Sequence, residues 1–174
     1  MKNQKAALVV VDVQQGLFNR PAALYKARQL LENVQRLVQA CKTQGMPVVY
    51  IQHENKKFLQ KGSENWQLHP GLSPAAEDIS IYKAHGNAFK NTCLQSELDK
   101  IGAETLVICG LTTHGCVNAT CMAALELGYR VILAADTHSS YHKAADRLIE
   151  EWNHKLSGAG AELASAEEIC GGDG

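Results

Sequence analysis

Short apolar runs alternate with longer stretches of helical spacing along this chain, and that alternation restricts the fold more than any other feature. The runs are rich in β-branched residues and too short to span a membrane or to form long helices, as expected of strands covered on both faces. They lie at residues 5–11, 47–52, 79–83, 106–109 and 130–135. Apolar residues recur at helical spacing over residues 23–44, 91–101, 119–127 and 142–156. The pattern predicts an α/β fold.

The expected architecture is a doubly wound, three-layer, Rossmann-like sheet that is mainly parallel, with residues 161–164 as a sixth strand at its edge. Length and composition are consistent with one domain, residues 1–174, because 174 residues with 45% apolar and 20% charged side chains can bury an ordinary core. The net charge of −1 provides no electrostatic reason to expect nucleic acid or an anionic membrane as partner.

The first residues begin basic and turn apolar, which raises the possibility of a signal peptide. Asp12 ends the apolar run before any cleavage site of small residues, so we expect a first strand and a cytoplasmic protein. The six cysteines include no C-x-x-C pair, and the chain is large for a disulfide-stapled scaffold. We therefore expect reduced thiols, of which five do no chemistry.

The remaining cysteine lies in a strand-turn-helix unit, residues 105–131. The strand ends at Gly110, a polar turn follows, and Cys116 opens the helix that Gly128 ends. Backbone N–H groups at a helix N-terminus lack intrahelical partners and carry partial positive charge. They are expected to lower the pKa of Cys116 and could also stabilise an oxyanion.

Asp12, Lys83, Cys116 and Asp136 all lie at or just beyond strand ends, where parallel sheets form their sites. Asp12 could accept the thiol proton if burial raised its pKa, and Lys83 could favour the thiolate. Simpler roles remain open at this point. An aspartate just after a strand can be a helix cap or a turn former, as we expect for Asp136, a lysine there can be merely solvated, and a cysteine can simply pack.

Three blocks of sequence resemble the isochorismatase-like cysteine hydrolase superfamily, which includes nicotinamidases and N-carbamoylsarcosine amidases. They read ALVVVDVQQGLF, IYKAHGNAF and VICGLTTHGCVNATCMAALELGYRV, in the family's order. The resemblance implies a hydrolase that cleaves a C–N bond of a small amide or carbamoyl compound through a thioester on Cys116, with Asp12 as base and Lys83 as third member. It implies no cofactor. It also implies a dimer or larger homo-oligomer.

The resemblance further implies an oxyanion hole formed by the backbone N–H groups of Thr112 and Cys116. In such proteins a non-proline cis peptide precedes the first donor, here Leu111–Thr112. Isochorismatase itself acts on a vinyl ether without a cysteine nucleophile, so that reaction is not expected.

The region after the second strand departs from the nicotinamidase pattern. Nicotinamidases carry an Asp-x-His metal pair there, whereas this chain reads Ile-Gln-His-Glu at residues 51–54. His53, Glu54 and His69 offer metal-binding atoms, but their spacing is not diagnostic, and we expect no metal. Residues 62–72 resemble a loop of metal-independent members.

Four side chains are candidate pocket walls: Phe18, Trp66, Phe89 and His114. Ordinary packing is the alternative for each aromatic residue, and His114 could simply bond to its turn. Two other functions also stay open. Cys116 and Cys121 could form a redox pair, although a separation of five residues places them poorly on a helix. The chain could also be a non-catalytic scaffold, although the intact Asp12, Lys83 and Cys116 argue against it.

Overall fold

The computed structural model describes residues 5–171 and contains one six-stranded sheet in the order β3-β2-β1-β4-β5-β6. Every neighbouring pair of strands is parallel. The expected α/β class and six-stranded sheet are therefore confirmed. The strands are β1 (Ala6–Val11), β2 (Val48–His53), β3 (Ile79–Lys83), β4 (Thr105–Leu111), β5 (Arg130–Ser139) and β6 (Glu162–Ala164).

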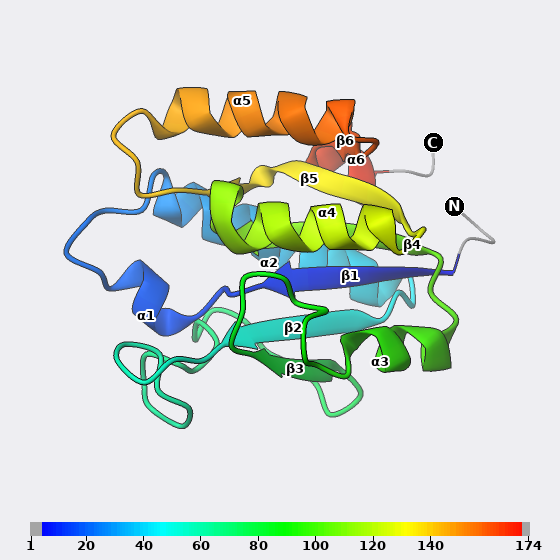
Figure 1. The fold of residues 1–174 in the computed structure, drawn as a ribbon, viewed down its shortest axis with the longest axis horizontal. Coiled ribbons are helices and arrows are strands. Elements are labelled where there is room, and N and C mark those ends of the chain that lie inside the picture. The colour runs from blue at the N-terminus through cyan, green and yellow to red at the C-terminus, as the bar shows by residue number, and fades with distance from the viewer. Residues whose placement is uncertain (1–4, 172–174) are drawn as a thin grey trace.

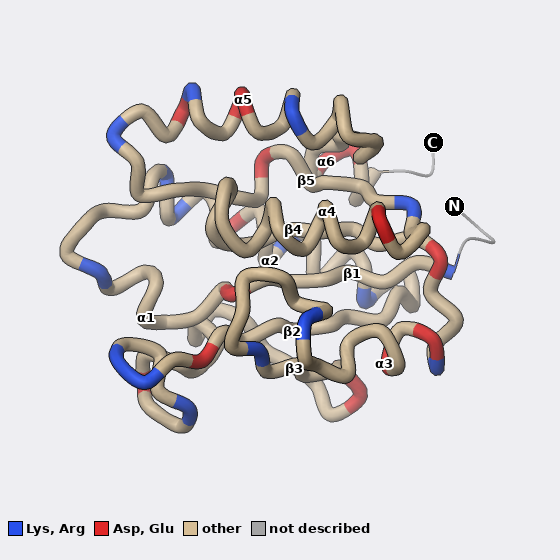
Figure 2. Tube along the Cα trace, viewed as in Figure 1, with Lys and Arg blue, Asp and Glu red and all other residues tan. Residues whose placement is uncertain are grey.

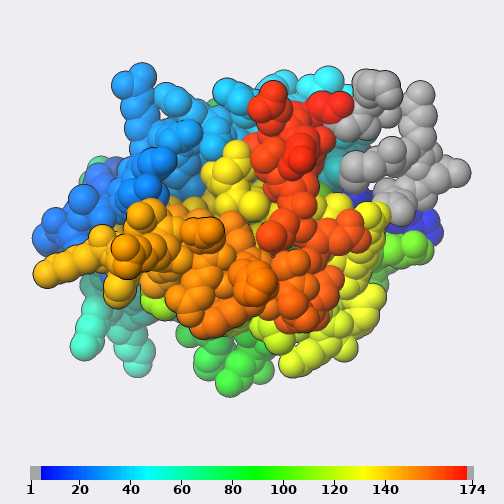
Figure 3. Space-filling view, turned by 90° about the horizontal axis from the view of Figure 1, so that it is seen from above, coloured from blue at the N-terminus to red at the C-terminus, as the bar shows by residue number. Residues whose placement is uncertain are grey.

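Helices cover both faces of this sheet (Figure 1). On one face, α2 (Ala27–Thr43) and the short α6 (Ala166–Cys170) lie side by side. On the other lie α3 (Leu94–Ile101), α4 (Asn118–Glu126) and α5 (Ala145–Gly158). The one-turn helix α1 (Gln15–Phe18) follows β1. Figure 3 shows α5 and α6 together over the β5–β6 side of the molecule.

Alternate residues of the central strands enter opposite cores, which explains why β1 is a continuous apolar run. Leu8 and Val10 pack with the buried stripe of α2, whereas Ala7, Val9 and Val11 pack beneath α3, α4 and α5. All six residues of β1 are buried. A strand buried on both faces loses the polar alternation of a half-exposed one.

The strand order reverses between β1 and β4, and this reversal locates the site. Crossovers run outward from β1 on one side and from β4 on the other, so the loops at their carboxyl ends separate and leave a crevice. Gly110 permits the close approach of the two strands. Its φ is +121°, and a methyl group there would overlap the backbone of Val11.

Several helix starts differ from the sequence-based expectation. Lys26 and Asn91 have positive φ values of 47° and 54°, so α2 and α3 begin only after them. Before α4, residues Thr113–Val117 form a short π-helical turn with a non-helical Gly115. Cys116 therefore lies in an irregular turn, and the regular helix begins two residues later.

The C-terminal third contains two further differences. β5 continues past Asp136 to Ser139, with a register irregularity against β4 between Ile108 and Gly110. The helix α6 was not expected, although its signal is present in the sequence. Ser165 caps it, and Glu168 bonds back to the Ser165 N–H in a capping box.

Acidic and basic residues are interspersed over the outer helices (Figure 2). Among the described residues, no helix combines the length and the apolar character that crossing a bilayer requires. The cytoplasmic location and the absence of a nucleic-acid partner stay predictions.

Candidate active site

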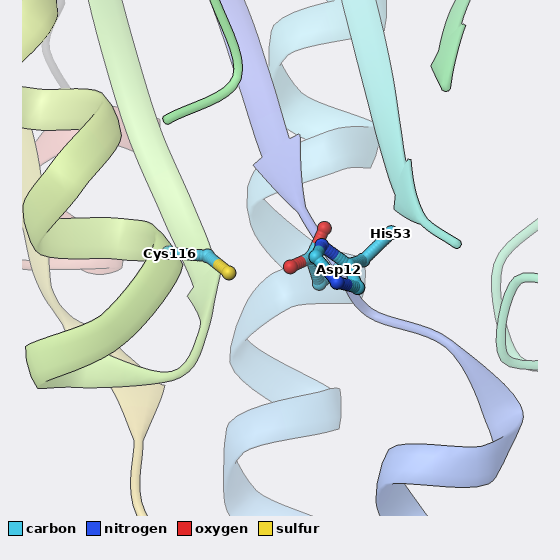
Figure 4. A group of neighbouring side chains, drawn as sticks. All are labelled: Asp12, His53 and Cys116. Carbon is cyan, nitrogen blue, oxygen red and sulfur yellow. The ribbon is translucent and has the colours of Figure 1, made fainter. Parts of the chain in front are cut away.

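Four side chains from four adjacent strand ends meet at the reversal point. Asp12 follows β1, His53 and Lys83 end β2 and β3 in register with each other, and Cys116 lies in the turn after β4. Lys83 Nζ lies 2.9 Å from Asp12 Oδ2, 2.9 Å from His53 Nδ1 and 3.2 Å from Cys116 Sγ. Figure 4 shows the sulfur of Cys116 facing Asp12 and His53, which overlap in this view. The structure thus brings together the three residues that the sequence singled out and adds His53.

Lys83 is the centre of this cluster. Its side chain is completely buried, and its three ammonium hydrogens match the three acceptors around it. Because an ammonium has no lone pair, His53 Nδ1 must be the unprotonated nitrogen. Burial lowers the pKa of His53, and the charge of Lys83 lowers it further, so the neutral ring is favoured.

Asp12 is held in a conformation unusual for a side chain other than glycine, with φ of 51°. Burial raises the pKa of its carboxyl above the ordinary 3.8, while Lys83 and the Cys116 thiol partly oppose that shift. Oδ2 accepts from Lys83, and the buried Oδ1 has no N–H or O–H donor within the described residues. Oδ1 is therefore available to accept a thiol proton.

The expected low pKa of Cys116 is wrong for this resting structure. Burial raises its pKa to about 11, and the negative charge of Asp12 adds to the increase, while Lys83 opposes it. The irregular turn also denies Cys116 the regular helix start on which the expectation rested. The resting group is a thiol, and it needs a base when it reacts.

The turn that carries Cys116 contains the expected cis peptide, Leu111–Thr112. The Thr112 carbonyl accepts from the N–H groups of Gly115 and Val117, which closes the turn. Both Thr112 and Cys116 face the cavity described next. The oxyanion role of their N–H groups stays a prediction.

A second buried network holds this turn from the other side. The Thr113 hydroxyl lies 2.8 Å from His138 Nδ1, and His138 Nε2 lies 2.8 Å from Asn153 Oδ1. Asn153 in turn donates to the carbonyl of Ala135. Burial lowers the pKa of His138. A neutral ring with its hydrogen on Nε2 satisfies every partner in this chain. No local sequence pattern indicates this network, because its members lie 25 and 15 residues apart.

A cavity of about 510 Å³ opens above Cys116. It is of the size that small-molecule sites have. Five segments supply its walls: Asp12, Leu17, Arg20, His53, Asn55, Leu59, Leu111, Thr112, His114, Cys116, Ser140, Tyr141 and His142. Residues 140–142 were not expected there, because they become neighbours only through the pairing of β5 with β4.

Of the four expected pocket walls, only His114 lines this cavity. Phe18 packs edge-on against His69, with ring centroids 4.6 Å apart. Trp66 is buried against Tyr82, and Phe89 stacks on Tyr129. These three aromatic residues support the fold around the site, which is the packing alternative noted above.

The long segment after β2 folds back onto β1 through a buried glutamine. Gln14 Nε2 donates to the carbonyls of His53 and Trp66, and its Oε1 accepts from the His53 N–H. Gln14 also pairs with Leu68 in an isolated antiparallel bridge. Trp66 thus contributes through its backbone, and His53 is fixed by Gln14, two residues after Asp12.

The only side chains of the described part that could together hold a metal are Asp12, His53 and Cys116. The ammonium of Lys83 already contacts Asp12 Oδ2, His53 Nδ1 and Cys116 Sγ, so a metal ion bound through those atoms would have to displace it. Glu54 and His69, the other members of the set considered from sequence, do not join such a group within residues 5–171. His69 Nδ1 instead accepts from the Gly71 N–H.

Two further residues have structural positions. Asp136 lies within β5 and accepts from the Ala166 N–H and the Asn33 side chain, away from the cavity. Its contacts are structural, but it lies inside β5 and not in the turn after a strand where the sequence placed it. Cys121 is completely buried in α4, and burial raises its pKa to about 12.

Comparisons with known proteins agree with the fold. Residues 6–168 match the isochorismatase domain family. Streptothricin hydrolase from Streptomyces noursei is 31% identical over 166 residues, which are 94% of this chain but only 60% of that protein. A crystal structure described as an isochorismatase family protein has a TM-score of 0.86 at 30% identity, covering 92% of this chain and 98% of its own. N-carbamoylsarcosine amidase from Thermoplasma acidophilum has a TM-score of 0.85 at 25% identity, covering 95% and 98%.

Proposed function

Because this chain belongs to the isochorismatase family of hydrolases, we propose that it is a cysteine hydrolase that cleaves the C–N bond of a small amide or carbamoyl compound. The observation that carries the proposal is the cluster around Lys83, in which a carboxylate oxygen of Asp12 and the sulfur of Cys116 lie 2.9 Å and 3.2 Å from the ammonium nitrogen. The relatives named a hydrolase and an amidase support the same reaction class.

The first half of the reaction forms a thioester. Asp12 Oδ1 takes the proton from Cys116 as the sulfur attacks the carbonyl carbon, and Lys83 stabilises the negative charge that develops on sulfur. The N–H groups of Thr112 and Cys116 hold the tetrahedral oxyanion. As the C–N bond breaks, Asp12 returns its proton to the nitrogen, and ammonia or an amine leaves.

The second half releases the acid. Water attacks the thioester carbonyl while Asp12 removes one of its protons. The new tetrahedral intermediate collapses with the sulfur as leaving group, and the proton on Asp12 returns to Cys116. Because burial raises the pKa of Asp12 above 3.8, the carboxylate is a better proton acceptor than an exposed aspartate.

The test is ammonia release from a panel of small primary amides and carbamoyl compounds by wild type and Cys116→Ala. We expect the substitution to reduce turnover at least about a thousandfold, because no other group can form the thioester. Cys93→Ala removes an exposed thiol elsewhere and should leave turnover unchanged. Mass spectrometry of quenched wild type should find the acyl group on Cys116. Unchanged turnover in Cys116→Ala would exclude thiol catalysis.

The redox alternative is weaker in this structure. Cys121 is fully buried with a raised pKa, so it is a poor partner for exchange with Cys116. A non-catalytic scaffold would have no need to keep a lysine buried between a thiol and a carboxylate. Assembly into a dimer or larger homo-oligomer remains part of the proposal, to be tested by light scattering.

A further inference from the structure

Arg20 is a cation on the wall of the cavity that the proposed mechanism does not use. It lies in the loop between α1 and α2, and within residues 5–171 it has no carboxylate partner. The other fixed charges at this site, Asp12 and Lys83, neutralise each other in a 2.9 Å ion pair. The cavity therefore has one uncompensated positive charge.

The guanidinium is held in place by aromatic rings. Arg20 Cζ lies 4.9 Å from the ring centroid of Phe58 and 5.4 Å from that of Tyr141. A guanidinium stacked on aromatic faces keeps its N–H groups at the edge free for a planar anion. The two rings therefore orient the guanidinium of Arg20 and leave its N–H groups available to a ligand.

Both rings are themselves fixed. The Asn55 side chain accepts from the backbone N–H groups of Lys57, Phe58 and Leu59, which shapes the loop that carries Phe58. The Tyr141 hydroxyl donates to the Leu17 carbonyl. Two segments distant in sequence thus converge on Arg20, and Asn55, Leu17 and Tyr141 also line the cavity.

We propose that Arg20 selects amide or carbamoyl substrates that carry a carboxylate at the end remote from the scissile bond. This inference rests on the proposed function. One fixed positive charge matches one negative charge, and the planar fork matches a carboxylate in a bidentate geometry. A dianion such as a phosphate ester would leave one charge unpaired. Arg20 touches the substrate but takes no part in bond cleavage, so it is a specificity-determining residue.

The first experiment separates anion recognition from amide cleavage. Iodoacetate and iodoacetamide alkylate the same thiol and differ mainly in the charge of a carboxylate against an amide. Rates of Cys116 alkylation, followed by peptide mass spectrometry at fixed pH and ionic strength, are compared for wild type, Arg20→Gln and Arg147→Gln. Arg147→Gln gives the same change in net charge on the exposed surface of α5.

We expect Arg20→Gln to slow alkylation by iodoacetate about tenfold and leave iodoacetamide unchanged, while Arg147→Gln changes neither. Equal rates in wild type and Arg20→Gln would overturn the proposal. An equal loss with both reagents would also overturn it, because Arg20 would then act on the thiol or the fold and not on the anion.

The second experiment uses turnover. Succinamate and succinamide present the same scissile amide, followed by a carboxylate or a neutral amide. Wild type should favour succinamate by about tenfold in kcat/KM. Arg20→Gln should lose that preference through KM, and Arg20→Lys should keep part of it. Absence of turnover with normal iodoacetate selectivity would reject the amide reaction and keep the anion site. Turnover with no charge preference would reject the anion site alone.

Discussion

Two buried networks hold the turn of Cys116, and they differ in charge. On the β1–β3 side, Lys83 contacts Asp12, His53 and Cys116 itself. On the β5 side, a neutral His138 links Thr113 to Asn153. Each network has one residue at its centre whose hydrogen-bonding capacity is matched by its partners. The charged network ends on the reacting sulfur of Cys116. The neutral network ends on the hydroxyl of Thr113, the residue that follows Thr112.

This difference suggests a division of labour. Charges near a thiol change its pKa and its reactivity, so they must contact the reacting atoms. A neutral network can fix a backbone position without shifting those pKa values, which an oxyanion hole requires. Substitutions in the charged network should therefore mainly change the pKa and reactivity of the Cys116 thiol. Substitutions in the neutral network should mainly change the position of the backbone at the oxyanion hole.

Asp12→Asn should produce the largest effect and test the first half of this division. Loss of the base should reduce turnover about 10²–10⁴-fold. The same substitution removes the negative charge that helps to raise the pKa of Cys116, while Lys83 still favours the thiolate. The pKa of Cys116 should therefore fall, and alkylation by iodoacetamide near pH 8 should become faster although turnover is lost.

The pH dependence of wild type provides the control. Turnover should fall as pH decreases and Asp12 becomes protonated, with a midpoint above the ordinary 3.8 because burial raises that pKa. Alkylation should still be increasing above pH 9, since the pKa of Cys116 is raised to about 11. If Asp12→Asn slowed both alkylation and turnover, Asp12 would be better explained as a structural ion-pair partner of Lys83 than as a general base.

Lys83→Met should give the next largest effect, on stability as well as rate. Removing the ammonium leaves the Asp12 carboxylate buried without its ion pair, which typically costs about 3–5 kcal/mol of unfolding free energy. The double substitution Asp12→Asn with Lys83→Met removes both charges and should recover much of that loss. Urea unfolding of Asp12→Asn, Lys83→Met and the double variant, each compared with wild type, measures these changes in unfolding free energy. A single Lys83→Met variant as stable as wild type would contradict a buried, fully engaged lysine.

Much of the fold could be predicted from the sequence, because strands and helices leave patterns in residues that are close together in the chain. Continuous apolar runs indicated buried parallel strands, and the spacing of Leu30, Val34, Leu37 and Cys41 indicated the buried face of α2. Helix starts were less accurate. The residue type of Lys26 does not indicate its positive φ, and asparagine favours such a value without requiring it, so Asn91 did not mark a boundary either. The start of α6 has a local signal in Ser165 and Glu168, which form its capping box, so this helix is predictable from sequence.

For the site, the strand-end position of Asp12, Lys83 and Cys116 was informative, because parallel strands bring their carboxyl ends together. The aromatic pocket walls were not predictable in this way. Phe18, Trp66 and Phe89 face other rings, while Arg20 and Tyr141 reach the cavity through loops whose positions depend on tertiary contacts. The raised pKa of Cys116 is not predictable from the sequence for a similar reason, because its largest cause is burial, which depends on tertiary packing.

Thr113→Val should give the smallest effect of the three and tests the neutral network. The substitution preserves shape but leaves the buried His138 Nδ1 without its donor, which should cost about 1–3 kcal/mol of unfolding free energy. We expect kcat to fall about tenfold with little change in KM, and the pH dependence of alkylation to stay that of wild type. Thr113→Ser should restore kcat, since it restores the hydroxyl.

The matched control is Thr43→Val at the exposed end of α2. The Thr43 hydroxyl bonds only within its own helix, so the change in unfolding free energy should stay within about 0.5 kcal/mol. A shift in the pH dependence of alkylation in Thr113→Val would show that the two networks are coupled and that the division between them is wrong.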